Sequence, residues 1–229
     1  MSSAADSLRH PLARALLVLT FTTGLVDAVS YLGLGHVFTA NMTGNIVLLA
    51  FGIAGSGNLP VVAPLVSLGA FLVGAGAGGI LAVRMAGHPR NTLTIALAIE
   101  ATLIGAATVL SAALDVRPGA ASGDAVIALL ALAMGVRNAT VRRLGVPDLT
   151  TTVLTMTLTG LAADSPLAGG SGKGSVRRVA AVLAMLAGAL SGALLLESGL
   201  VAPLAAAALL ALVAWLISGA VGRRTVSTP

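Results

Sequence analysis

Eight hydrophobic stretches follow one another through the chain, separated by short connections. They cover residues 12–34, 39–54, 59–83, 92–114, 121–141, 150–163, 179–196 and 200–221. A helix that crosses a hydrocarbon core of roughly 30 Å needs about 20 largely apolar residues, and six of the stretches approach or exceed that length. Charged residues make up only 9% of the chain and hydrophobic residues 57%, which is typical of a surface in contact with lipid. We therefore predict an all-α integral membrane protein, with residues 1–229 forming a single transmembrane domain in the lipid bilayer.

Two of the stretches, 39–54 and 150–163, are too short for an ordinary span and begin with polar residues. The first carries Thr39, Asn41, Thr43 and Asn45, and the second carries Thr150, Thr151, Thr152 and Thr155. Short apolar segments with polar heads are typical of re-entrant or broken helices, which enter the membrane and return to the side they came from.

The distribution of basic residues separates six crossings from eight. If all eight stretches cross, eight of the thirteen Lys and Arg residues face the cytoplasm. If the two short stretches re-enter, twelve of the thirteen face the cytoplasm and only Arg117 lies outside. Because cytoplasmic loops are enriched in Lys and Arg, the second topology is favoured. The prediction is six transmembrane helices in the inner (plasma) membrane, with both termini cytoplasmic, and the net charge of +5 is read as a topology signal and not as a nucleic-acid patch.

Six spans divide into two halves that run in opposite directions, which predicts an inverted 3+3 repeat. Residues 12–114 form the first repeat, residues 121–221 the second, and residues 164–178 a flexible cytoplasmic linker. Register support comes from four residues of the first half that recur 111 residues later: Gly24, Asp27, Ala28 and Thr39 correspond to Gly135, Asn138, Ala139 and Thr150. We call this separation the repeat offset.

Glycines four positions apart also recur, as Gly74 and Gly78 in the first half and as Gly188 and Gly192 in the second. Small residues at this spacing are predicted to mediate helix packing. The alternative to a repeat is that these glycines mark only close packing, which small residues permit anywhere in a membrane.

Two motifs resemble the signature of the YoaK family, a group of bacterial six-span membrane proteins of unknown function. They are GLVDAVSYLG at residues 24–33 and VFTANMTGN at residues 37–45. The second half is similar to the same pattern in MGVRNA at residues 134–139 and in the Thr-rich run from Thr150. The chain departs from it at Arg137, where the family pattern has Gln, and at Met156, where it has Gly. The resemblance implies a bacterial six-span fold and no particular activity.

Three ionisable side chains fall inside predicted spans: Asp27, Glu100 and Arg137. Each costs about 2.5–3.5 kcal/mol at the centre of a bilayer, so each needs a partner or a water-filled cavity. At a helical rise of about 1.5 Å per residue, Glu100 and Arg137 lie at similar depths in their helices. We predict that they form an ion pair. The pair is either functional or a static contact that holds two helices in register.

Polar side chains near the two short segments are candidates for substrate binding. They are Asp27, Thr39, Asn41, Thr43, Asn45, Asn138, Thr151, Thr155 and Thr159. Asp27 either carries a coupled proton or fixes the first segment by accepting hydrogen bonds from Thr39, Asn41 or backbone donors. Thr151, Thr155 and Thr159 follow one another at every fourth position and share one helix face. They either line a polar path or bond back to their own helix backbone.

Several motifs that would indicate an enzyme or a cofactor are incomplete. The glycine-rich run before Lys173 has Leu167 where a phosphate-binding loop needs glycine, and no strand precedes it. The chain has no cysteine, and its three histidines are far apart. We expect no metal, no cofactor and no enzymatic activity.

These features favour a small secondary transporter that carries a small polar or anionic metabolite or an ion by alternating access, with proton coupling as an option. A non-transporting scaffold, an enzyme on a lipid-embedded substrate and a channel-like pore are the alternatives. The substrate is unknown, no nucleic-acid partner is expected, and a homodimer is compatible with the sequence.

Overall fold

The computed structural model describes residues 11–143 and 154–224, and all regular secondary structure in those ranges is helical. The α-helices are α2 (Pro11–Gly33), α3 (Met42–Ile53), α4 (Val62–Arg84), α5 (Pro89–Ala113), α6 (Ala121–Arg143), α7 (Leu154–Ala163), α8 (Ser175–Leu196) and α9 (Val201–Arg224). Two short 3₁₀ helices, Ser56–Asn58 and Pro166–Ala168, follow α3 and α7. Each predicted hydrophobic stretch coincides with one α-helix, although the predicted start of the sixth stretch lies outside the described residues.

Five helices are long and apolar enough to cross a bilayer: α4, α5, α6, α8 and the Val201–Ser218 part of α9. The shorter apolar helices are the Leu17–Gly33 part of α2, together with α3 and α7. The described part of the chain is therefore all-α, as predicted, and its helices are consistent with a multi-pass membrane protein.

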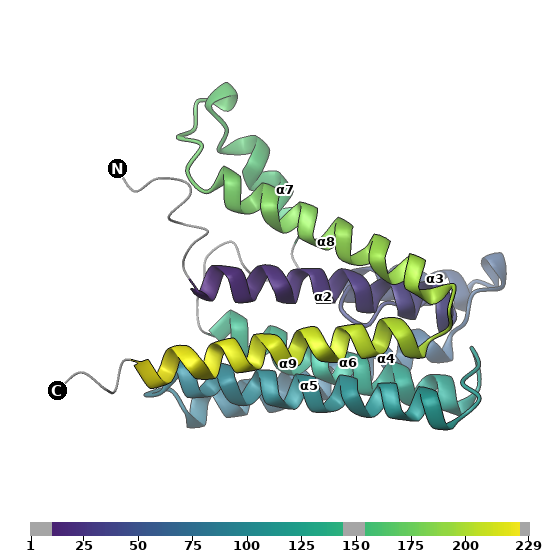
Figure 1. Cartoon of the computed structure of the whole chain (residues 1–229). Helices are drawn as coiled ribbons and strands as arrows, with labels where there is room; N and C mark the ends of the chain where they lie inside the picture. Colours follow the sequence, from purple (N-terminus) through teal and green to yellow (C-terminus); the bar gives the residue numbers. More distant parts are fainter. Residues whose placement is uncertain (1–10, 144–153, 225–229) are drawn as a thin grey trace.

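The long helices lie side by side in a bundle, and α3 and α7 sit at opposite ends of it (Figure 1). The α4–α5 and α7–α8 connections lie at one end, together with the two ends of the described chain (Figure 1). We call this the basic end, because the helix termini there carry Arg84, Arg90, Arg143 and Arg177. The α2–α3, α3–α4, α5–α6 and α8–α9 connections lie at the opposite end (Figure 1).

Three helix pairs dominate the packing: α4 with α6, α2 with α8, and α5 with α9. The first two pairs run parallel and the third antiparallel (Figure 1). In the first pair, Gly74 and Gly78 lie directly against the backbone of α6, and a side chain on either would overlap with the carbonyl groups of Leu132 and Val136. The predicted packing role of these two glycines is thus realised in a close crossing, as expected for small residues in membrane helices.

The second pair repeats this contact. Gly188 and Gly192 of α8 lie against the backbone of α2, where a side chain would overlap with the carbonyl groups of Phe21 and Leu25. Each partner helix also contributes a glycine of its own to the crossing. Gly135 of α6 meets the backbone of α4, and Gly24 of α2 meets the backbone of α8.

The core lies where α2, α5, α6 and α9 meet, with Leu25, Ile104, Ile127, Met134 and Leu204 fully buried in one cluster. Among the five spans, α6 is the most buried and α4 and α8 are the least. The exposed leucines and valines of α4 and α8 face outward, where a hydrocarbon environment accepts them. The bundle therefore places α4 and α8 at its periphery and α6 at its centre.

Candidate functional site

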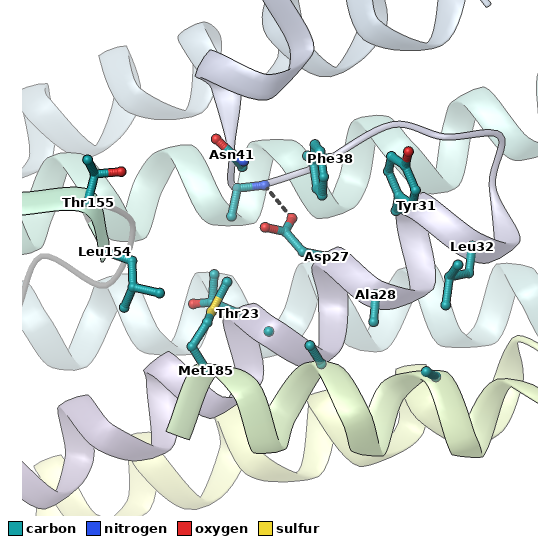
Figure 2. Close-up of a pocket in the computed structure, with 14 residues that line it drawn as sticks. Thr23, Asp27, Ala28, Tyr31, Leu32, Phe38, Asn41, Leu154, Thr155 and Met185 are labelled. Atoms are coloured by element: carbon teal, nitrogen blue, oxygen red, sulfur yellow. Dashed lines mark hydrogen bonds between the residues drawn. The ribbon is translucent and has the colours of Figure 1, made fainter. Parts of the chain in front are cut away.

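A cavity of about 420 Å³ lies beside α2, between the 34–41 segment, the start of α7 and α8. Its polar lining consists of Thr23, Asp27, Asn41 and Thr155. Most of the remaining wall is apolar, formed by Tyr31, Leu32, Phe38, Leu154 and Met185 with several alanines. Figure 2 shows Asp27 and Asn41 on one side of this space, Leu154 and Thr155 at the start of α7, and Met185 on α8. Parts of both predicted short segments therefore meet at one cavity.

Asp27 owes its position to a reversal of the chain after α2. Gly35 and His36 have φ angles of 102° and 58°, and the turn that they form brings the 34–41 segment back beside α2. Asp27 Oδ1 then accepts hydrogen bonds from the backbone N–H groups of Thr39 at 3.0 Å and Ala40 at 2.9 Å. Backbone donors inside a membrane need an internal partner, and Asp27 supplies it. The predicted fixing role of Asp27 is present, and the same side chain lines the cavity.

Asn45 holds the segment from the other side and is fully buried. Its Oδ1 accepts from the N–H of Phe38 at 2.9 Å, and its Nδ2 donates to the carbonyl of Phe38 at 2.7 Å. Nδ2 also donates to Ser67 Oγ of α4 at 3.1 Å, and Ser67 donates to the Phe38 carbonyl at 2.7 Å. We call this set of bonds the Asn45 clamp. The Asn45 amide is used in the clamp and does not line the cavity, and its predicted role in substrate binding stays a prediction.

The other polar residues predicted at the first short segment differ in where they lie. Asn41 lines the cavity and also caps α3, since its Oδ1 accepts from the N–H of Gly44 at 3.3 Å. Thr39 is fully buried, and Thr43 is exposed on α3; neither lines the cavity. Of the polar residues predicted at the first short segment, Asn41 joins Asp27 in the cavity wall, whereas Thr39 and Thr43 lie outside it. The substrate-binding role predicted for Thr39 and Thr43 stays a prediction.

The threonines predicted at the second short segment likewise lie partly in the cavity wall and partly outside it. Thr155 lines the cavity, whereas Thr159 is exposed one turn further along and donates to the carbonyl of Thr155 at 2.9 Å. Thr159 thus follows the alternative in which the hydroxyl bonds back to its own helix. Thr151 lies outside the described residues. Asn138 is half-buried on α6 and does not line this cavity.

The predicted ion pair is present, with Arg137 Nη1 2.8 Å from Glu100 Oε1 and both side chains fully buried. Arg137 also donates to the carbonyl of Leu19 at 3.2 Å and to the hydroxyl of Thr23. Thr23 lines the cavity one turn before Asp27. The pair therefore lies directly behind the cavity wall and joins α5, α6 and α2.

A further cation, Arg178 at the start of α8, holds α7. Its Nη1 donates to the carbonyl of Gly160 at 2.6 Å and lies 2.8 Å from Asp164 Oδ2. Arg178 was predicted only to be a topology signal, and no local sequence pattern distinguishes it from neighbouring Arg177.

Thr23 and Tyr31 line the cavity and were not predicted to belong to the site. A signal for them existed in the sequence. Both lie four positions from Asp27, one on each side, and therefore share its helix face.

Comparison with known proteins supports a membrane assignment and supplies no activity. Residues 15–216 match the family described as "Protein of unknown function (DUF1275)". The chain is 39% identical over 154 residues to "UPF0700 transmembrane protein YoaK" of Bacillus subtilis (strain 168). That match covers 65% of this chain and 65% of the relative's length. No solved structure matches the chain.

Proposed function

We propose a function from the geometry of the cavity, because the chain belongs to the DUF1275 family, whose description assigns none. This membership confirms the resemblance to YoaK expected from its motifs. The protein is proposed to be a small secondary transporter in the bacterial inner membrane. It carries a small polar or charged solute by alternating access, and Asp27 is at the centre of the binding site. The observation that carries the proposal is a cavity of about 420 Å³, built from both halves of the chain around a buried carboxyl group.

The proposed topology has six spans, with the basic end in the cytoplasm. Arg84, Arg90, Arg143 and Lys173 lie on helix ends or connections at the basic end, while Arg117 lies in a connection at the opposite end. This asymmetry supports a cytoplasmic basic end and cytoplasmic termini. In the same frame, α3 enters and leaves from the outer side, and α7 enters and leaves from the cytoplasmic side.

The proposed inverted repeat rests on reciprocal packing. Leu132 and Val136, which contact the first glycine pair, correspond at the repeat offset to Phe21 and Leu25, which contact the second pair. The two glycine pairs are themselves 114 residues apart, from Gly74 to Gly188, which is slightly more than the repeat offset. The packing of α4 on α6 thus corresponds to that of α8 on α2, as two inverted halves would require.

Alternating access needs a site between two bodies that can move against each other. The cavity meets this requirement, since α2 and the 34–41 segment belong to the first half and α7 and α8 to the second. The glycine crossings bring helix backbones of the two halves into direct contact, where a small relative rotation meets no large side chains. We infer that substrate reaches Asp27 from one side and leaves to the other as the halves rock.

A non-transporting scaffold is the main rival, and it differs in what it requires of the interior. A scaffold is expected to have a sealed apolar core and has no use for a polar-lined cavity. The presence of Asp27, Asn41 and Thr155 around one space of this size favours a carrier over a scaffold.

Solute flux into proteoliposomes tests the proposal. Full-length protein is reconstituted and screened with labelled amines, amino acids, carboxylates and inorganic ions, with and without a pH gradient. At least one solute is expected to enter, and Asp27→Asn is expected to slow its entry by about tenfold or more, as for a lost interaction with a charged group. Asp115→Asn is the matched control, because Asp115 is exposed and pairs with Arg117 at the surface. Wild-type protein that moves no solute under any gradient would overturn the proposal in favour of a scaffold.

A further inference from the structure

The charge balance of the cavity is one-sided. Among the described residues that line it, Asp27 is the one acidic or basic side chain. Behind the wall lies Arg137, and Glu100 neutralises it at 2.8 Å. Arg137 contacts the wall through the hydroxyl of Thr23 and also attracts the Asp27 carboxylate from behind it. The cavity therefore presents a carboxylate to a ligand, and the described part of its wall offers no compensating positive side chain.

The carboxylate itself is arranged for a second partner. Both backbone hydrogen bonds of Asp27 go to Oδ1, and the side chain keeps a 5% exposed fraction. Figure 2 shows the other oxygen directed away from the 34–41 segment, on the side of Leu154 and Thr155. A charge at this depth is costly unless a partner of opposite sign approaches it.

An aromatic wall adjoins the carboxylate. Tyr31 and Phe38 both line the cavity, and their rings stack with centroids 4.9 Å apart and planes at 22°. The faces of aromatic rings attract cations within about 6 Å, and the attraction grows when water is excluded. An anion placed in the same cavity meets the negative ring faces and a carboxylate.

We propose that the cavity binds a small organic cation, a protonated amine, whose ammonium group contacts Asp27 and the aromatic wall of Tyr31 and Phe38. This inference rests on the proposed function and names its substrate class. The apolar part of the amine lies against Leu32, Leu154 and Met185. A bare metal ion fits less well, because hard cations take about six or more oxygen ligands and the cavity wall is mostly apolar.

Binding of three ligands that share a phenyl ring and differ in charge tests the proposal. Purified full-length protein in detergent is titrated by calorimetry with benzylammonium, benzyl alcohol and benzoate at neutral pH, and tetramethylammonium serves as a second cation. Benzylammonium is expected to bind about tenfold or more tightly than the alcohol or benzoate, because it alone of the three brings a positive charge to the Asp27 carboxylate. Asp27→Asn is expected to remove this preference, and Asp115→Asn is expected to keep it.

A second variant guards against a folding defect at Asp27. Tyr31 takes no part in the hydrogen bonds between Asp27 and the 34–41 segment, so Tyr31→Leu leaves those bonds in place. It is expected to weaken benzylammonium binding about two- to fivefold and to leave benzyl alcohol binding little changed. Equal binding of benzoate or benzyl alcohol, preference retained in Asp27→Asn, or no binding of either cation would overturn the proposal.

The titration is made without a gradient, so it separates this proposal from the one on which it rests. Amine binding that depends on Asp27, combined with no flux of any solute, supports the cation site and counts against transport. Flux of a neutral or anionic solute that depends on Asp27, with no amine binding, supports transport and overturns the cation site.

Discussion

The short helices α3 and α7, which correspond to each other in the proposed inverted repeat, are held by different chemistry. The α3 end is held inside the bundle by the Asn45 clamp, in which neutral amide, hydroxyl and backbone groups bond at 2.7–3.1 Å. At the repeat offset, Asn45 corresponds to Met156, which is 66% exposed. Counted from the glycine pairs, Ser67 corresponds to Ala181. The clamp is therefore absent at these positions of the second half.

In the second half, α7 is held at its other end by Arg178, which reaches Gly160 and Asp164. Asp164 is 54% exposed, so this contact stands at the edge of the bundle and partly in solvent. The comparison teaches that both glycine pairs make the same kind of close crossing, whereas the two short helices are attached by different groups. The buried neutral clamp is expected to be worth more than the partly exposed charged contact.

The largest effect is expected at another difference between the halves, the ion pair of Glu100 and Arg137. Arg137 corresponds at the repeat offset to Val26, so the first half has no such charge there. Glu100→Ala leaves a buried guanidinium without its counter-charge and is expected to cost about 3–5 kcal/mol of unfolding free energy. Fluorescence of Trp215 during denaturation in detergent measures it.

The control is the double variant Glu100→Ala with Arg137→Met, which removes both charges. It is expected to recover most of the lost stability, because no unpaired charge remains. A double variant as unstable as the single one would contradict the view that Glu100→Ala destabilises the fold mainly by leaving the charge of Arg137 uncompensated.

An intermediate effect is expected from breaking the clamp. Asn45→Ala removes the three clamp bonds that the Asn45 amide makes and leaves the N–H of Phe38 without its partner, at a cost of about 1–3 kcal/mol. Met156→Ala at the corresponding position is expected to cost about 0.5 kcal/mol or less, because that side chain is exposed. Thermal unfolding followed by circular dichroism compares them, and equal losses would show that the two short helices are held alike.

The smallest effect is expected at the α7 attachment. Arg178→Ala removes the ion pair between the nearly buried Arg178 and the half-exposed Asp164. The expected cost is about 1 kcal/mol of unfolding free energy, and it becomes smaller as salt is added. Arg117→Ala is the control, since its pair with Asp115 is exposed on both sides and is expected to contribute little. Unfolding midpoints at low and high salt measure both. A cost at Arg178 that is large and independent of salt would contradict this ranking.

Much of the framework was predictable because lipid imposes strict requirements on sequence. Length and polarity located the helices, since a span must be long and apolar. The pairing of Glu100 with Arg137 followed from depth alone, because a charge in hydrocarbon needs a partner and few were available. The glycine crossings followed from spacing, since small residues permit close approach in a membrane.

The site was only partly predictable. The cavity is lined by Asp27, Asn41 and Thr155, as expected. Asn45 and Thr159 were also expected there, but their side chains donate hydrogen bonds to backbone carbonyl groups. The polarity of a side chain says that it needs a partner in lipid. It does not say whether that partner is a ligand or the backbone of a neighbouring segment.

What the sequence by itself determined is the membrane class, the positions of the helices and the need for buried charges to meet. Only the tertiary structure decided that the chain turns back at Gly35 and His36, which stacks Tyr31 on Phe38 and leaves Asp27 facing a cavity. The physical reason is range: hydrophobicity and spacing act along one helix, whereas the direction of a side chain depends on which distant backbone donors arrive beside it.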